Sequence, residues 1–338
     1  MNSTKALLVR WKPTAPWRIG DDSGSREFSG GVLHSDTLYA AVCSAMLSFG
    51  WLPEWLDATA QASVPAAVFT SAFPWHGDQL YFPAPVPLWP PKGAGRRVRS
   101  ATFIPAGVLK NLLSGLAVEE SKWVPDAVSG CLLLADRAHR GGPFRHSLRT
   151  RASVDRLTNT VGQVNKIGAI EFSDQAGLWN AVTFRDEEAR QNWRTRIVAC
   201  LRYLADTGLG GNRSCGWGRS AAPSFDDRHV EALIWPEAPT LEGAKAWLNL
   251  SLFHPAASDS IDWSRGGYKL LQRGGRIESS EQWGVQKNSV AMIAEGSVMV
   301  ASAKPVGSAP DAAPSGFPHP VYKNGFAVTI EIPWRANA

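Results

Sequence analysis

The chain has 338 residues, of which 44% are hydrophobic and 19% charged, and its formal net charge is +5. This composition excludes a disordered chain, and the length favours two domains over a single core. No apolar run reaches the roughly 18 residues that a membrane span needs, and the N-terminus lacks the features of a secretory signal. Because the four cysteines lie far apart and form no C-x-x-C pair, we expect no zinc site, no disulfide framework and a cytoplasmic location.

The first third of the chain alternates strand and helix signals. We predict, in chain order, a strand at residues 5–11, a loop at 13–31, a helix from about Ser35 to Gly50, a hairpin at 69–86 and a short helix at 104–116. The first helix is predicted from apolar residues at helical spacing, with Ser35 as its N-cap and Asp36 in its first turn. The hairpin is expected to turn near Gly77.

The middle of the chain is harder to interpret. Residues 117–165 have weak periodicity and many Gly and Arg, with no clear element beyond residues 131–134, as is usual for functional or disordered loops. The later predictions are strands at 169–172 and 179–184, a helix at 186–206 capped by Asp186 and stopped by Gly208, a loop at 221–228, and strand-like runs at 246–253, 268–271, 289–300 and 326–332. The order of elements in the first part is ferredoxin-like, so we predict an α+β protein. The β-rich last third could be a degenerate second copy.

The positive charge is concentrated in the first two thirds of the chain. Residues 1–222 carry 25 Lys and Arg against 18 Asp and Glu, whereas residues 223–338 carry 10 against 12. The excess lies at residues 92–110, which have no acid, and at residues 137–156, where six arginines accompany Asp155 alone. Since arginine binds phosphate through two hydrogen bonds of fixed geometry, these stretches favour a phosphate-rich partner over ordinary solvated loops.

The sharpest local motif is G-L-G-G-N-R-S-C-G-W-G-R at residues 208–219, which has five glycines in its first eleven residues. It lacks the spacing of a dinucleotide fingerprint and the Gly-Lys-Ser/Thr of a P-loop. Its backbone amides could approach a ligand closely, with Asn212, Arg213, Ser214 and Arg219 as side-chain donors. The alternative is a tight helix-to-strand connection that needs several positive φ angles.

Two further constellations could bind RNA. The predicted helix start at Gly30–Leu38 offers free amides to phosphate, and His34 could act as a general acid–base residue, although a capping or packing histidine is the more common case. In a strand, Arg149 and Arg151 would share one face and form a short basic ladder, with Asp155 and Arg156 as a local ion pair. The sequence has no paired acids at metal-site spacing and no Ser/His/Asp order, so we expect a non-enzyme without cofactors.

Several motifs occur together in a characteristic order. They are L-H-S-D-T-L-Y at 33–39, L-Y-F-P-A-P at 80–85, F-I-P at 103–105, S-V-D-R-L-T at 153–158, the glycine-rich loop, S-R-G-G-Y at 264–268, A-E-G-S-V at 294–298 and H-P-V-Y-K-N-G-F-A at 319–327. Spanning nearly the whole chain, they resemble the Csm four family, the RAMP subunits at the foot of type III-A CRISPR effector complexes. The glycine-rich loop alone marks only the RAMP superfamily, and a related subunit of type III-B complexes is the nearest alternative.

The resemblance implies two ferredoxin-like (RRM-like) domains, at residues 1–222 and 223–338, with a β-hairpin thumb inserted at about 75–175. It implies no catalysis, and a role in capping the 5′ handle of the CRISPR RNA (crRNA), with the thumb near target RNA. The implied protein partners are the large polymerase/cyclase-like subunit and the first backbone RAMP subunit, with no membrane. The RNA-facing candidates, together with Arg97 from the first basic stretch, are His34, Ser35, Arg149, Arg151, Arg156, Gly210, Gly211, Asn212, Arg213 and Ser214.

Two other hypotheses remain open at the level of sequence. The first is a RAMP endoribonuclease that processes CRISPR repeat RNA, with His34 as its acid–base residue. The second is an assembly module that contacts only proteins. The acidic last third suits a protein partner better than RNA, whereas the arginines, the glycine loop and the aromatic residues of the first part suit a single-stranded RNA.

Overall fold

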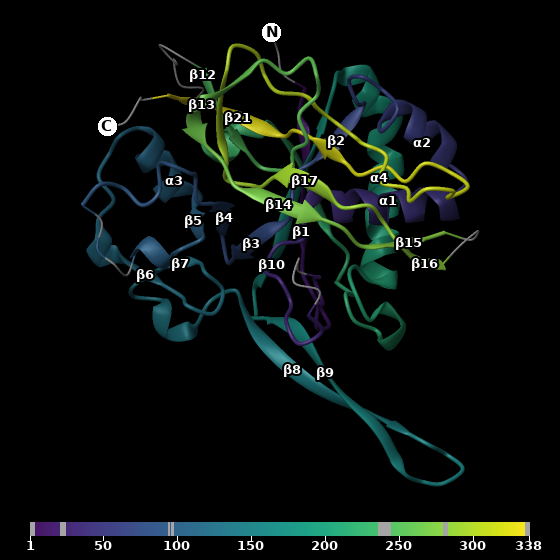
Figure 1. The fold of residues 1–338 in the computed structure, drawn as a ribbon. Helices are drawn as coiled ribbons and strands as arrows, with labels where there is room; N and C mark the ends of the chain where they lie inside the picture. The colour runs from purple at the N-terminus through teal and green to yellow at the C-terminus, as the bar shows by residue number, and fades with distance from the viewer. Residues whose placement is uncertain are drawn as a thin grey trace.

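The computed structural model describes residues 4–20, 25–93, 95, 98–235, 245–279 and 283–334. Helices and antiparallel sheets together confirm the predicted α+β class (Figure 1). The larger sheet has seven strands in the order β11-β1-β10-β3-β4-β5, with β2 also paired to β10. Its strands are β1 (Ala6–Trp11), β2 (Ala67–Phe69), β3 (Phe73–His76), β4 (Gln79–Pro83), β5 (Phe103–Pro105), β10 (Ala176–Phe184) and β11 (Ser224–Arg228).

Both faces of this sheet are covered. Leu7 and Val9 of β1 belong to one core, with residues of the helices α1 (Ser35–Ser48), α2 (Leu52–Ala58) and α4 (Glu187–Thr207). The intervening Leu8 belongs to a second core, with Leu248 and Ile330 of the smaller sheet. This alternation arises because successive residues of a strand point to opposite faces. The chain therefore forms three layers: helices, the larger sheet and the smaller sheet.

The smaller sheet comes from the last third of the chain. It has the order β13-β18-β12-β21, with all neighbours antiparallel. Its strands are β12 (Lys245–Asn249), β13 (Ile261–Gly267), β18 (Val298–Ala301) and β21 (Thr329–Pro333). No α-helix follows α4 in the described part of the chain. The connections instead contain the strand pairs β14 (Leu270–Arg273) with β17 (Val290–Ile293), β15 (Arg276–Glu278) with β16 (Trp283–Gln286), and β19 (Gly307–Ser308) with β20 (Gly325–Phe326).

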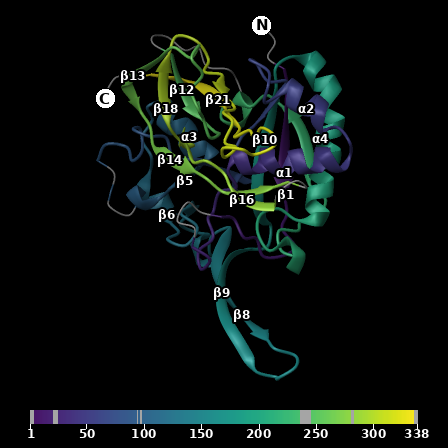
Figure 2. The ribbon, with the colours of Figure 1, turned by 45° about the vertical axis from the view of Figure 1, so that its right-hand side comes forward.

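A long two-stranded hairpin projects from the body of the molecule, formed by β8 (Phe144–Val154) and β9 (Val161–Phe172) (Figures 1 and 2). The expectation of no clear element across residues 117–165 is wrong here. Apart from Phe144 at its root and Ser147, β8 is exposed on both faces. A strand that buries neither face shows no apolar alternation, and so the usual sequence signal is missing.

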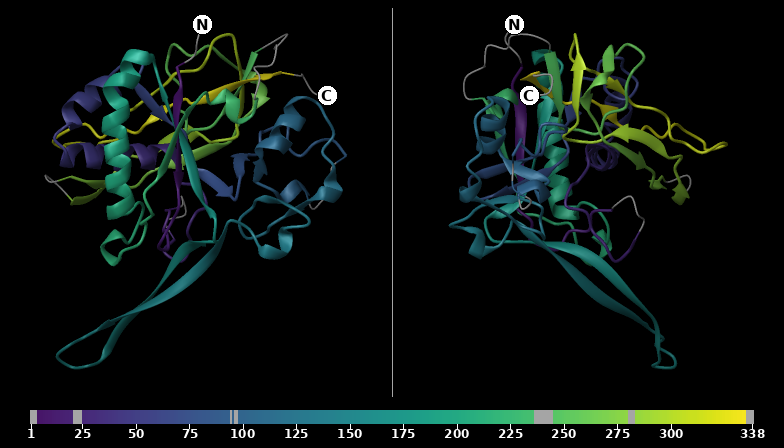
Figure 3. Two further views of the ribbon diagram at one scale, coloured as in Figure 1. Left: turned by 180° about the vertical axis from the view of Figure 1, so that it is seen from behind. Right: turned by 60° about the vertical axis from the view of Figure 1, so that its left-hand side comes forward.

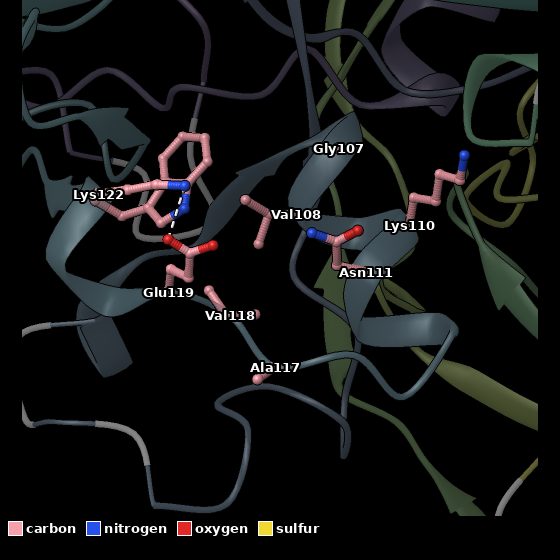
Figure 4. A pocket seen from close by; sticks show the side chains of 9 residues that line it. Gly107, Val108, Lys110, Asn111, Ala117, Val118, Glu119 and Lys122 are labelled. Carbon is pink, nitrogen blue, oxygen red and sulfur yellow. Dashed lines mark ion pairs between the residues drawn. The ribbon is translucent and has the colours of Figure 1, made fainter.

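A small module lies beside the hairpin root, seen from two further sides in Figure 3. It contains α3 (Ala106–Leu113) and the pair β6 (Trp123–Pro125) with β7 (Leu132–Leu134). A cavity of about 350 Å³ opens between α3 and β6, lined by apolar residues such as Val108 and Val118 and by Lys110 and Asn111 (Figure 4). At its rim, Lys122 pairs with Glu119 at 2.7 Å.

Most of the predicted elements are confirmed, including β1, α1, α3 and the turn at Gly77 between β3 and β4. For α4, the Asp186 carboxylate accepts a hydrogen bond from the amide of Ala189 (2.7 Å), and Gly208 ends the helix. The predicted loop at 221–228 is wrong, because it contains β11, which pairs with β1. The single run at 289–300 is two strands, β17 and β18, separated by a turn.

The predicted N-cap of α1 is also wrong. Ser35 is the first helical residue, and His34 occupies the cap position without a side-chain capping bond. The hydroxyl of Ser35 instead accepts a hydrogen bond from the amide of Leu252 (2.9 Å) in the last third of the chain. The helix start is therefore held by tertiary contacts rather than by a local cap.

Within the described residues, no helix is both long and apolar enough to cross a membrane. The same part of the chain contains no group of three or more His, Cys, Asp or Glu side chains that could hold a metal ion.

Candidate nucleic-acid interface

The glycine-rich loop and the hairpin root are joined by an N-terminal segment, residues 13–28, of which 21–24 lie outside the described part. The amide of Gly211 donates to the carbonyl of Arg18 (2.8 Å). Trp17 exchanges two backbone hydrogen bonds with Ile170 of β9 (2.9 and 2.8 Å). We call this assembly of residues 13–20, 25–28, 144–172 and 208–219 the platform; the N-terminal segment and the glycine loop lie at the end of the molecule from which the hairpin projects (Figure 2).

The glycines of the loop serve its own folding. Gly208, Gly210, Gly216 and Gly218 all have positive φ, and Asn212 adopts the left-handed conformation. A Cβ at Gly210 would overlap the carbonyl oxygen of Arg18. The positive φ angles expected for a tight connection are therefore present. The same compact path leaves Arg213 half-buried and Ser214 exposed at the surface of the platform.

Gly218→Ala should destabilise the protein by about 2–4 kcal/mol, because the residue has a φ of 80° and its Cβ would overlap the carbonyl oxygen of Leu209. Thermal or urea unfolding measures this loss. Gly216→Ala is the matched control, since its φ is also 80° but its Cβ would meet nothing within 4 Å. It should cost about 1 kcal/mol, the strain of the backbone alone. Equal losses in the two variants would contradict the role of close backbone contact.

The predicted arginines fall into paired and unpaired groups. Arg213 donates to both carboxylate oxygens of Glu278 (2.9 and 2.7 Å). Arg149 donates to Glu171 across the hairpin at 2.5 Å. Arg151 and Arg156 are exposed, with no ion-pair partner among the described residues. Arg97 lies outside the described part of the chain.

The expected pairing of Asp155 with Arg156 is absent from the described hairpin. The Asp155 carboxylate instead accepts hydrogen bonds from the amides of Leu157 (2.8 Å) and Thr158 (3.3 Å), which stabilise the turn at the hairpin tip. These bonds lower the pKa of Asp155. The Arg156 guanidinium is left for other partners.

The structure adds an aromatic surface that the sequence analysis missed. Phe28 is 49% exposed, and its ring stacks on His146 of β8 with centroids 5.3 Å apart. Arg26, nearby in the same segment, is exposed, and its carbonyl accepts a hydrogen bond from the amide of Gly168. Exposed aromatic rings beside arginines are the surfaces on which unpaired bases stack. The only sequence signal was an aromatic residue in a polar loop, which is too weak to find it.

His34 and Ser35 lie elsewhere, at the joint between the two sheets. Nδ1 of His34 is 2.8 Å from Oε1 of Glu295, which also accepts a hydrogen bond from Ser71. Burial alone would lower the pKa of His34, but the Glu295 carboxylate more than offsets this and the pKa is raised. Nδ1 of His34 and the hydroxyl oxygen of Ser35 are therefore already bonded to other parts of the chain, away from the platform.

Asp36 anchors a second buried cluster at the same joint. Its carboxylate is 2.8 Å from Nζ of Lys323 and accepts two hydrogen bonds from Arg273 (3.1 and 3.2 Å). Burial would raise the pKa of Asp36, but the two cations outweigh it and hold the pKa well below its usual range. The motifs at residues 33–39, 294–298 and 319–327 therefore meet here and bind the first and last parts of the chain together.

Comparisons with known proteins agree with this architecture. Residues 242–332 match the family model of the CRISPR Csm4 C-terminal domain. The chain is 26% identical to the "CRISPR system Cms protein Csm4" of Thermococcus onnurineus (strain NA1), over 97% of this chain and 98% of that protein.

Solved structures show the same fold. One is a Csm3-Csm4 subcomplex of the type III-A CRISPR-Cas interference complex (16% identity, TM-score 0.65, 98% of this chain and 99% of that one). Another is a Csm1-Csm4 cassette with cA4 (17% identity, TM-score 0.59, 98% and 100%). These matches confirm the resemblance predicted from the motifs: the chain is similar to Csm4 proteins over nearly its whole length, and residues 242–332 match the Csm4 C-terminal domain.

Proposed function

We propose that this protein is a non-catalytic, RNA-binding scaffold subunit of a type III-A CRISPR (Csm) interference complex, and that it holds the 5′ repeat-derived handle of the crRNA. The observation that carries this proposal is the platform. It joins a compact glycine loop, a basic hairpin and the exposed Phe28 ring through backbone hydrogen bonds. Single-stranded RNA needs these three kinds of contact, namely backbone approach, phosphate pairing and base stacking.

The proposed protein partners follow from the relatives. Solved Csm4 structures come from a Csm1-Csm4 cassette and a Csm3-Csm4 subcomplex. By analogy, this chain would bridge the large polymerase/cyclase-like subunit and the first backbone RAMP subunit in antiviral defence. The excess of acids over bases in residues 223–338 supports protein contacts for the last third, because it disfavours an RNA backbone there.

We further propose that both halves are ferredoxin-like and that the β8–β9 hairpin is the thumb, close to target RNA. Two sets of four strands support this: β11-β1-β10-β2 in the larger sheet and β21-β12-β18-β13 in the smaller one. When the strands of each set are numbered in chain order, both sets have the spatial order 4-1-3-2. The smaller sheet lacks crossover helices in its described residues. The division at residue 222 stays a prediction, and β11, which lies just beyond it, completes the first sheet.

The endoribonuclease alternative gives a direct test. We expect the purified protein to bind repeat RNA but leave it intact in the absence of metal, because His34 is held by Glu295 at the joint rather than on the platform. Gel analysis of labelled repeat RNA measures both outcomes. Site-specific cleavage that His34→Ala abolishes would overturn the non-catalytic proposal, and a failure to bind repeat RNA would overturn the scaffold proposal.

A further inference from the structure

Two carboxylates lie against the arginines of the platform. Glu171, at the end of β9, sits directly across the hairpin from Arg145. It accepts hydrogen bonds from Nε and Nη2 of Arg145 (3.2 and 2.9 Å) through one oxygen, and from Arg149 (2.5 Å) through the other. At the glycine loop, both oxygens of Glu278 in β15 accept hydrogen bonds from Nη2 of Arg213 (2.9 and 2.7 Å).

Arg145 donates through two nitrogens to one carboxylate oxygen, whereas Arg149 and Arg213 each donate through Nη2 alone. The anionic oxygens of a phosphate could accept the same charge-assisted hydrogen bonds. Glu171 is 20% exposed, whereas the arginines that it binds are 76% and 50% exposed. The acid is therefore held in place by the hairpin root, and the arginines can leave it without disturbing a core. Hydrogen bonds from Arg149 and Arg145 lower the pKa of Glu171, so it is charged at neutral pH.

We infer that Glu171 and Glu278 act as phosphate surrogates, binding the guanidinium groups of Arg145, Arg149 and Arg213 until RNA phosphates replace them. This inference rests on the proposed function and explains how the platform could select the crRNA handle over other polyanions. A polyanion that binds only through its phosphates gains little free energy when it replaces a carboxylate, because one ion pair is exchanged for another. An RNA whose bases also stack on the platform gains additional binding free energy, and this drives the replacement. Exposed ion pairs are weak, so the exchange is readily reversible.

The test compares wild type with Glu171→Gln by fluorescence anisotropy, using labelled repeat RNA across a salt series. Glutamine keeps the shape of the side chain and removes its charge. We expect Glu171→Gln to bind about three- to tenfold more tightly, since each released ion pair is worth about 0.2–1 kcal/mol. Its salt dependence should be steeper by about one unit, because two arginines are free to release counterions. Glu278→Gln, a second variant on a different element, should shift the affinity in the same direction.

Glu331→Gln is the matched control, because Glu331 pairs with Lys245 in the smaller sheet at 3.5 Å and its loss changes the net charge equally. It should leave the affinity within about twofold of wild type. Unchanged or weaker binding by both Glu171→Gln and Glu278→Gln would overturn the inference while leaving RNA binding by the wild type intact. A wild type that fails to bind repeat RNA even at low salt would overturn the proposed function, and this inference with it.

Discussion

Asp36→Asn is expected to lower the free energy of unfolding by about 3–5 kcal/mol, the cost of breaking a buried ion pair from one side. The substitution leaves Arg273 and Lys323, both less than a tenth exposed, without their shared counter-charge. It also loosens the joint between α1 and the last third of the chain, since both cations lie beyond residue 270. Urea unfolding monitored by tryptophan fluorescence measures the loss.

Asp226→Asn serves as the control for this variant. Asp226 pairs with Arg228 at the surface, with both side chains about half exposed. Its replacement should change the unfolding free energy by no more than about 1 kcal/mol, as for other exposed pairs. If Asp36→Asn were as mild as Asp226→Asn, the joint would not depend on the buried cluster.

The two buried clusters at the joint predict the pH dependence of stability. The pKa of Asp36 is depressed in the folded state by Lys323 and Arg273, so its contribution is present above the unfolded pKa of about 4 and is lost as the pH falls below it. His34 behaves in the opposite way. Its folded pKa is raised by Glu295, so its contribution is present below about pH 6.5 and is lost as the pH rises through the folded pKa. Stability should therefore be greatest at mildly acidic pH.

The second large effect concerns RNA. The triple variant Arg149→Gln/Arg151→Gln/Arg213→Gln should bind repeat RNA about a hundredfold more weakly, if each arginine contributes roughly 1 kcal/mol through a charge-assisted bond to phosphate. The slope of log affinity against log salt should fall by about two units, at about 0.7 per contact with a single strand. Anisotropy titrations between about 50 and 200 mM salt measure both quantities.

A second triple variant serves as the control, because it removes three positive charges from residues outside the platform. Arg185, which follows β10, and Arg228, at the end of β11, form surface ion pairs with Asp186 and Asp226, and Lys245 lies in the smaller sheet. Replacing these three with glutamine should leave the salt slope unchanged within about half a unit. An unchanged slope in the platform variant would count against phosphate contacts there, whatever its effect on affinity.

Periodic elements could be predicted from the sequence, whereas contacts between distant segments could not. The apolar spacing of α4 and its cap at Asp186 were sufficient to define that helix. The β8–β9 hairpin was missed because it buries neither face. The tryptophans could not be placed from composition, and the structure puts Trp11, Trp17 and Trp179 in the core with no exposed surface.

The candidate site was only partly predictable, for a similar reason. The arginines and the glycine loop stand out in the sequence, but their acidic partners do not. Glu278 follows Arg213 by 65 residues, and only the fold brings them together. The motif at residues 33–39 was distinctive enough to suggest the family. Its His34 and Asp36 nevertheless bind Glu295, Arg273 and Lys323, so a distinctive motif here marks a structural joint.

The most direct measurement of the central claim is cross-linking of the assembled complex, with photoreactive nucleotides placed in the crRNA 5′ handle and the attached peptides identified by mass spectrometry. The account predicts that the cross-linked peptides of this chain come from the platform, residues 13–20, 25–28, 144–172 and 208–219. Cross-links confined to the outer helices α2 and α4, or to the smaller sheet, would contradict it.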